Sequence, residues 1–242
     1  MVVFLFYRLK KMKTSTKTKA LLIANGQIEN PLLLMELLIN TYHFNNKFMI
    51  VSADGALKNC LYLKLVPDIV IGDMDSICEN DKKILKTINP DALFIKSPCE
   101  KDESDTQLAL EYLVERDIKN IILIGALGKR TDHGLANIFN ISSEKLANAQ
   151  IKIIDETHEI SVLRQSAQIS GIIGNSLSIF SLTPSTFFIN TDGLKYRLSE
   201  EKLLFCPVRG LSNIIEKEKV MLDFKDGILL LIKEVRKLNK PV

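Results

Sequence analysis

The stretch Ile69-Val70-Ile71-Gly72-Asp73-Met74-Asp75-Ser76 decides the fold prediction for this chain. Three β-branched residues followed by a glycine and two carboxylates are typical of a buried parallel strand that ends in a loop. Ligands of open α/β sheets bind at that edge. With a period of two, Asp73 and Asp75 would point the same way, and such close like charges are unfavourable unless a metal or a proton lies between them. Oxygen ligands suit a hard ion such as Mg²⁺, whereas the alternative for this motif alone is an N-capping aspartate in a solvated turn.

Between residues 20 and 155, short apolar runs alternate with segments of helical spacing. This alternation predicts an α/β domain with a doubly wound, mostly parallel sheet that is covered on both faces. The expected strands are Ala20–Ala24, Phe48–Ser52, Asp68–Ile71, Ala92–Lys96, Asn120–Gly125 and Ile151–Asp155, and the expected helices include Leu32–Ile39, Gln107–Arg116 and Leu135–Leu146.

After Glu156 the pattern changes, because apolar runs follow one another with only turn residues between them. This spacing predicts an all-β C-terminal domain, an antiparallel sandwich or barrel. Asp226-Gly227 stands between two apolar runs and predicts a hairpin turn. The expected domains are therefore 20–155 and 156–242, preceded by a basic, disordered extension over residues 1–19.

Charge and composition limit the classes of function. The chain of 242 residues carries a formal net charge of +3, but its first 19 residues hold six bases and no acid, and the remainder holds 26 bases and 29 acids. A body without a basic stripe is a poor candidate for nucleic-acid binding. No apolar run approaches the roughly 20 residues of a membrane helix. Met12 is a second candidate for the first residue.

The spacing of the cysteines and the absence of two nucleotide-binding motifs argue against further classes of protein. The four cysteines are far apart and include no C-x-x-C pair, which argues against zinc and a disulfide framework and predicts reduced thiols in the cytoplasm. The chain has no G-x-x-x-x-G-K-[ST] and no G-x-G-x-x-G motif, so neither a P-loop nor a dinucleotide fingerprint is present.

Four polar clusters follow the expected strands: Asp54-Gly55, Gly72–Ser76, Lys101–Asp105 and Gly125–His133. Their position predicts acids, glycines and an arginine gathered at one edge of one sheet, as a Mg²⁺–nucleotide site requires. Each cluster alone has a structural alternative. Asp-Gly is an ordinary turn, Ser104 is a typical N-cap with Asp105 in the first turn, and the glycines of the last cluster could mark a strand–helix connection.

Taken together and in this order, the clusters resemble the thiamine pyrophosphokinase family. That family carries an Asp-Gly-Gly turn, a Pro-Asp-x-x-x-Gly-Asp-x-Asp-Ser strand end, a Lys-Asp-x-Thr-Asp helix start, a Gly-x-x-Gly-x-Arg-x-Asp-His-x-x-Ala-Asn loop and a Ser-Asn pair near the thiamine. The matching segments are Asp54-Gly55-Ala56, Pro67–Ser76, Lys101–Asp105, Gly125–Asn137 and Gly210-Leu211-Ser212-Asn213. Ala56 replaces the second glycine, Ser104 replaces the usual threonine, and the chain has no tryptophan.

The resemblance implies transfer of the pyrophosphoryl group of ATP to the hydroxyl of thiamine, which gives thiamine diphosphate and AMP. It implies a homodimer with the active site at the subunit interface. The implied catalytic carboxylates are Asp54, Asp73, Asp75 and Asp105, the last three as Mg²⁺ ligands. The implied ATP and phosphate residues are Lys101, Ser104, Gly128, Arg130, Asp132 and His133, and the implied thiamine residues are Ser212 and Asn213.

Two other classes stay open at this point. One is another Mg²⁺-dependent pyrophosphotransferase or pyrophosphohydrolase on the same scaffold, whose product would form without thiamine. The other is a sensor that binds a nucleotide or thiamine diphosphate and has lost turnover. Retention of all the acids of the metal site argues against a sensor.

Overall fold

The structure, a computed structural model, describes residues 17–98, 102–128 and 130–236 and divides into two compact units. The first unit ends at Ile151 and the second begins at Lys152, so the boundary lies inside strand β6 (Gln150–Ile154). Within the described ranges, no helix has both the length and the apolar character needed to cross a membrane.

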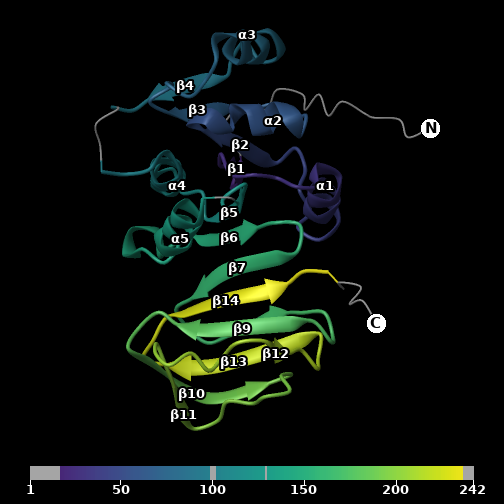
Figure 1. The fold of residues 1–242 in the computed structure, drawn as a ribbon, viewed down its shortest axis with the longest axis vertical. Coiled ribbons are helices and arrows are strands. Elements are labelled where there is room, and N and C mark those ends of the chain that lie inside the picture. Colours follow the sequence, from purple (N-terminus) through teal and green to yellow (C-terminus); the bar gives the residue numbers. More distant parts are fainter. Residues whose placement is uncertain (1–16, 99–101, 129, 237–242) are drawn as a thin grey trace, which may run out of the picture. The chain divides into compact units, whose positions relative to one another are not determined.

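The first unit contains a parallel sheet in the order β5-β1-β2-β3-β4 (Figure 1). The chain steps outward from β1 to β4, and helix α4 then returns it to β5 on the other side of β1. The sheet therefore has a topological switch point between β1 and β5. The strands are β1 (Lys19–Ile23), β2 (Phe48–Ala53), β3 (Ile69–Gly72), β4 (Leu93–Lys96) and β5 (Asn120–Ile124).

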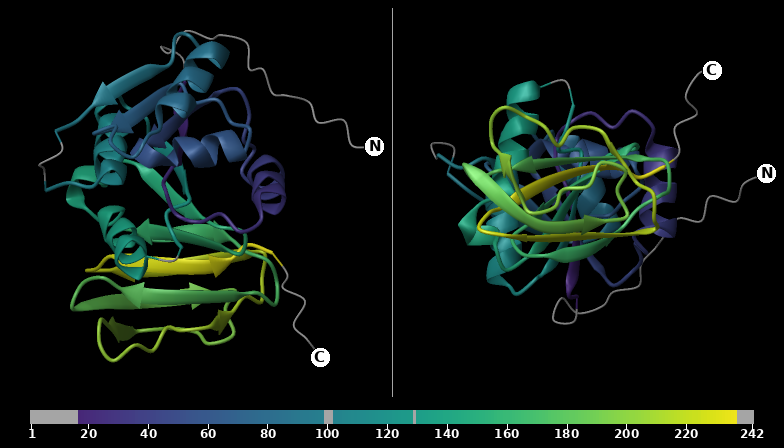
Figure 2. Two further views of the ribbon diagram at one scale, coloured as in Figure 1. Left: turned by 45° about the horizontal axis from the view of Figure 1, so that its top comes forward. Right: turned by 90° about the horizontal axis from the view of Figure 1, so that it is seen from below.

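Helices or short 3₁₀ turns occupy the connections between these strands and the connection from β5 to β6, and can be followed from two further directions in Figure 2. They are α1 (Pro31–Asn40), η2 (Asp54–Ala56), α2 (Leu57–Tyr62), α3 (Glu79–Ile88), α4 (Asp105–Glu115), α5 (Thr131–Asn140) and η3 (Glu144–Leu146). Helix α4 buries Ala109, Leu110 and Leu113 and packs on β1, β2 and β3. The predicted α/β domain is confirmed, but the helix expected over Leu135–Leu146 begins earlier and already ends at Asn140.

Part of the predicted N-terminal extension belongs to the folded unit. Lys19 begins β1, and the Lys17 side chain is only 8% exposed. Its ammonium group donates to both carboxylate oxygens of Asp68, at 3.0 and 2.8 Å. The same carboxylate accepts the N–H of Ile50 at 2.8 Å, so Asp68 joins the start of β2 to the residues before β1. The prediction of a disordered extension is wrong for residues 17–19.

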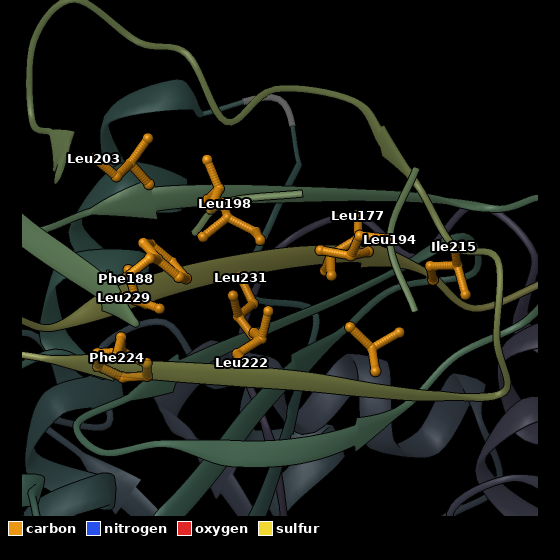
Figure 3. Close-up of a cluster of buried hydrophobic side chains, with 12 residues drawn as sticks. Leu177, Phe188, Leu194, Leu198, Leu203, Ile215, Leu222, Phe224, Leu229 and Leu231 are labelled. Carbon is orange, nitrogen blue, oxygen red and sulfur yellow. The ribbon is translucent and has the colours of Figure 1, made fainter. Parts of the chain in front are cut away.

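The second unit is an antiparallel sandwich, as the sequence predicted. Its two sheets have the orders β12-β9-β14-β7-β6 and β11-β10-β13-β8. Side chains from both sheets form one core, which includes Leu177, Phe188, Leu222 and Leu231 (Figure 3). The strands are β7 (His158–Leu163), β8 (Ala167–Ser170), β9 (Ser176–Ser181), β10 (Ser185–Asp192), β11 (Glu201–Leu204), β12 (Asn213–Ile214), β13 (Lys219–Lys225) and β14 (Leu229–Glu234).

The hairpin predicted at Asp226-Gly227 is wrong. Strand β13 pairs with β10 and β8, whereas β14 pairs with β7 and β9, so this turn carries the chain from one sheet to the other. Asp226 has the left-handed φ of 56° that such a turn favours. The dipeptide predicted a turn correctly, but turn chemistry does not specify which strands pair.

A buried carboxylate joins three strands of the second unit. Glu159 on β7 accepts from Lys152 on β6 at 3.2 Å, and its other oxygen lies 3.4 Å from Nζ of Lys233 on β14. The side chains of Glu159 and Lys233 are 8% and 13% exposed. Burial lowers the pKa of Lys233, while Glu159 opposes this shift. The Glu159 carboxylate therefore compensates the positive charge of Lys233, which the sheet would otherwise bury without a counter-charge.

Glu159→Gln should lower the free energy of unfolding by about 3 kcal/mol, because it removes the counter-charge of a buried lysine. Urea denaturation measures the effect. Glu79→Gln is the matched control, since Glu79 and Lys82 form an ion pair on the surface of α3, where solvent screens the charges. Equal stability of the two variants would contradict this account of Glu159.

Candidate active site

The carboxyl ends of β1, β2, β3 and β5 lie at one edge of the parallel sheet, and predicted site residues follow β2, β3 and β5. Ile23 of β1 is in register with Ser52 of β2 and with Ile124 of β5, and Ala53 of β2 is in register with Ile71 of β3. The loops that follow these strands therefore begin at nearly the same level. Their described residues are 24–30, 54–56, 73–78, 125–128 and 130.

Asp54, Asp73 and Asp75 converge at this edge. One carboxylate oxygen from each residue lies within 4.8 Å of the others. Asp54 is 4% exposed, Asp73 is half-buried and Asp75 is exposed. Three like charges this close are unfavourable unless a cation or a proton compensates them. Because every donor is an oxygen, the set fits a hard divalent cation.

Local hydrogen bonds orient the three carboxylates. Oδ1 of Asp54 accepts the N–H of Met74 at 3.0 Å, which joins the loop after β2 to the loop after β3. Oδ1 of Asp73 accepts the N–H of Asp75 at 3.1 Å, and Oδ1 of Asp75 accepts the hydroxyl of Ser76 at 2.9 Å. Each carboxylate therefore has at least one bond that restricts its rotation.

The convergence of Asp73 and Asp75 was predicted for the wrong reason. The strand ends at Gly72, and the following residues form a bend in which Met74 has a left-handed φ of 69°. The bend and the bond from the Asp75 N–H, and not strand alternation, place the two side chains. Asp54 also has a positive φ of 35°. Such strained residues concentrate at functional sites, each costing about 1–3 kcal/mol.

Gly72 permits the close approach of β3 to Asp54. A Cβ atom on Gly72 would lie 2.5 Å from the Cβ of Asp54, which is shorter than any normal contact. Ala56, which departs from the family pattern, is fully buried with helical φ and ψ of −68° and −7°. An alanine is therefore accommodated at position 56 without strain.

Asp105 and Ser104 lie at the start of α4. The Ser104 hydroxyl caps the helix by accepting the N–H of Gln107 at 3.2 Å, and Asp105 is in the first turn. Among the residues with assigned structure, the cluster of possible metal ligands contains Asp54 and not Asp105. Metal ligation by Asp105 stays a prediction. Lys101, another predicted phosphate residue, falls outside the described residues.

The loop between β5 and α5 holds the remaining ATP candidates. The guanidinium of Arg130 donates twice to the carboxylate of Asp132, at 2.9 and 2.6 Å. This hydrogen-bonded pair holds the pKa of Asp132 well below its usual range. His133 is exposed in the first turn of α5, and Gly128 is exposed with a φ of 149°. Arginine, a glycine-rich loop and a helix start together suit an anion.

The predicted thiamine residues lie in the second unit. Ser212 has a φ of 54°, and its N–H donates to the hydroxyl of Ser178 at 3.0 Å. Asn213 is 6% exposed, and its side-chain amide accepts from the N–H of Tyr196 at 3.0 Å and donates to the carbonyl of Tyr196 at 2.7 Å. Asn213 therefore fixes the backbone of Tyr196, whose side chain is 60% exposed.

No sequence pattern predicted a role for the loop after β1, Ala24–Gln27, which lies at the switch point. The N–H of Gly26 donates to the carbonyl of Gly125 at 2.7 Å, and a Cβ on Gly55 would lie 2.8 Å from the Asn25 amide. The available signal was an Asn-Gly dipeptide directly after a buried strand. That dipeptide by itself predicts only a turn.

Comparisons with known proteins agree with this arrangement. A family model described as thiamin pyrophosphokinase, catalytic domain, matches residues 41–154, and one described as thiamin pyrophosphokinase, vitamin B1 binding domain, matches residues 157–229. The chain is 25% identical over 185 residues to thiamine pyrophosphokinase of Bacillus subtilis, which covers 76% of this chain and 86% of that protein.

Solved structures share the fold. The crystal structure of thiamine pyrophosphokinase from Bacillus subtilis superimposes with a TM-score of 0.76 at 22% identity, over 89% of this chain and 98% of that chain. The crystal structure of a thiamin pyrophosphokinase family protein from Enterococcus faecalis gives a TM-score of 0.73 at 24% identity, over 90% of this chain and all of that chain.

Gly72→Ala should lower the free energy of unfolding by about 2 kcal/mol, because the added methyl group overlaps the Cβ of Asp54. Denaturant unfolding gives the value. Gly134→Ala in α5 is the control, since its Cβ would meet nothing closer than 3.7 Å and alanine favours the helix. A Gly72→Ala variant as stable as the unaltered chain would disprove this close packing.

Proposed function

We propose that this chain, which belongs to the thiamin pyrophosphokinase family, transfers the pyrophosphoryl group of ATP to the hydroxyl of thiamine. The products are thiamine diphosphate and AMP. The observation that carries the proposal is the convergence of Asp54, Asp73 and Asp75 at the carboxyl edge of the parallel sheet, in a chain that matches both family models.

The metal we propose is Mg²⁺, held by Asp54, Asp73 and Asp75, with Asp105 of α4 as a further ligand. All of these donors are carboxylate oxygens, the ligand type that Mg²⁺ prefers. When bound, the cation offsets the negative charge of the phosphates and of the reacting pyrophosphoryl group. The hydrogen bonds from Met74, Asp75 and Ser76 keep the carboxylates oriented before ATP arrives.

The rest of the proposed phosphate site is the loop between β5 and α5. Arg130, oriented by Asp132, offers a fork of donors, and Gly128 leaves space for a phosphate near the start of α5. His133 and Lys101 complete the proposed set, with Ser104 at the start of α4. These groups would stabilise the AMP that leaves when the thiamine oxygen bonds to the β-phosphorus and the bond to the α–β bridging oxygen breaks.

The proposed thiamine residues are Ser212 and Asn213. Their support is the left-handed backbone of Ser212 and the two bonds by which Asn213 holds Tyr196. Because the Asn213 amide is engaged in these bonds, its contribution to binding would be to arrange the neighbouring backbone. The exposed ring of Tyr196 offers an aromatic surface beside them.

The first test is an assay of the purified protein with ATP, Mg²⁺ and thiamine, with nucleotide and thiamine products separated by chromatography. We expect equal amounts of AMP and thiamine diphosphate. A product that forms without thiamine would favour another pyrophosphotransferase or a pyrophosphohydrolase, and ATP binding without any product would favour a sensor.

Asp75→Ala should reduce this turnover by at least about a thousandfold while the chain stays folded, because the side chain is exposed and serves the cation. Asp91→Ala is the control, since Asp91 is an exposed acid ahead of β4, at the opposite edge of the sheet. Activity close to that of the unaltered chain in Asp75→Ala would eliminate the metal assignment. Circular dichroism would verify the fold of both variants.

A homodimer and a cytoplasmic location are part of the proposal. Support for the dimer is the exposure of four apolar residues close together in the sequence of the second unit, Leu204, Phe205, Val208 and Leu211, which are 46–63% exposed. Cys78 and Cys206 are exposed free thiols, which suits a reducing compartment.

Phe205→Asp should shift the sedimentation equilibrium of the protein from dimer toward monomer, because it places a charge among these apolar residues. Ile173→Asp, at a residue exposed to a similar extent between β8 and β9, is the control. A monomeric unaltered chain would refute the dimer, and an undisturbed dimer in Phe205→Asp would refute this interface.

A further inference from the structure

The loops after β1 and β5 touch through their backbones. The Gly26 N–H donates to the Gly125 carbonyl at 2.7 Å. A Cβ on Gly26 would lie 2.2 Å from the Leu127 carbonyl oxygen, and a Cβ on Gly128 would lie 2.9 Å from the Gln27 nitrogen. Neither loop can therefore shift without the other. We call these two segments, Ala24–Gln27 and Gly125–Gly128, the switch-point loops.

Two asparagine side chains from outside both loops are bonded to them: Asn137 of α5 donates to the Ala126 carbonyl at 2.8 Å, and Asn59 of α2 holds the β1 loop. Nδ2 of Asn59, in α2, donates to the Ala24 carbonyl at 3.0 Å and to the Gly26 carbonyl at 2.8 Å. The same nitrogen would lie only 3.5 Å from a Cβ on Gly125. Asn59 therefore contacts the β1 loop directly and sits against the β5 loop.

The switch-point loops lie where an open α/β sheet binds its ligand, outside the carboxyl ends of the strands on either side of the reversal in strand order. Gly128 and Arg130 are proposed phosphate residues. Their loop is bonded to Asn137 at Ala126 and to the β1 loop through the Gly26–Gly125 hydrogen bond, and Asn59 in turn bonds the carbonyl of Gly26. A small displacement of such groups has large effects on binding and orientation.

We propose that Asn59 is a positioning residue for the nucleotide, which fixes the switch-point loops in the conformation that receives ATP. The inference rests on the proposed function for the identity of the nucleotide. Asn59 lies in none of the matched motifs. An amide suits the role because one NH₂ group can donate to two carbonyls, which neither alanine nor aspartate can do.

Asn59→Ala should weaken nucleotide binding about tenfold, since it removes both bonds to the β1 loop. Isothermal titration calorimetry with α,β-methylene ATP and Mg²⁺ measures the affinity, because this analogue cannot release AMP. In the thiamine assay, KM for ATP should rise to a similar extent and KM for thiamine should not change. A purely structural role would lower the active fraction, and hence kcat, without this selectivity.

Asn89→Ala is the matched control. Asn89 is also half-buried at a helix, and its amide donates to the carbonyl of Pro67 at 3.0 Å, before the amino end of β3 and away from the site. We expect unaltered nucleotide affinity in this variant. Equal affinity in Asn59→Ala and the unaltered chain, or an equal loss in both variants, would overturn the inference.

Hydrogen exchange of the unaltered chain tests the inference without relying on a variant. Addition of the analogue should protect amides in both switch-point loops, and no protection in either loop would overturn the inference. Failure of the proposed function is a separate result. If the unaltered chain makes no thiamine diphosphate but Asn59→Ala selectively loses nucleotide affinity, the positioning role stands and the reaction is wrong.

Discussion

The repulsion among three carboxylates with oxygens within 4.8 Å of one another is the constraint on which the rest of the first unit depends. Asp54 comes from the loop after β2, while Asp73 and Asp75 come from the loop after β3. Their separation is fixed by strand register, by the bond to the Met74 N–H and by the missing side chain at Gly72. The sheet thus holds three negatively charged carboxylates close together, and a bound cation with its phosphate ligand would relieve their repulsion.

The strands and their common edge could be predicted because buried parallel strands are short apolar runs that end in polar loops. The Ser104 cap was also readable, since capping depends on local residue types. Helix α3 was missed because Glu79–Lys83 is wholly polar and resembles a loop. The place of Asp54 in the acidic cluster was underestimated for another reason. It depends on the contact between Gly72 and Asp54, residues 18 positions apart, which no local pattern encodes.

The two units use the same device to hold irregular backbone. In the first, the Asn59 amide donates to two carbonyls and that of Asn137 donates to the Ala126 carbonyl at 2.8 Å. In the second, the Asn213 amide bonds both backbone groups of Tyr196. Asparagine satisfies loop groups that no strand or helix partner reaches. Sequence patterns identify Asn137 and Asn213 as motif positions, but not that their amides face the protein's own backbone.

The crossing at Asp226-Gly227 has a consequence for the order in which the second unit assembles. Strand β14 is the final strand of the described chain, yet it lies between β7 and β9 in the interior of its sheet. During synthesis, β7 and β9 leave the ribosome well before the strand that separates them. Their edges stay unpaired until β14 arrives, and the non-local pairing of Leu229 with Leu163 closes the sheet late and slowly. The sheet can therefore be completed only after β14 has been synthesised.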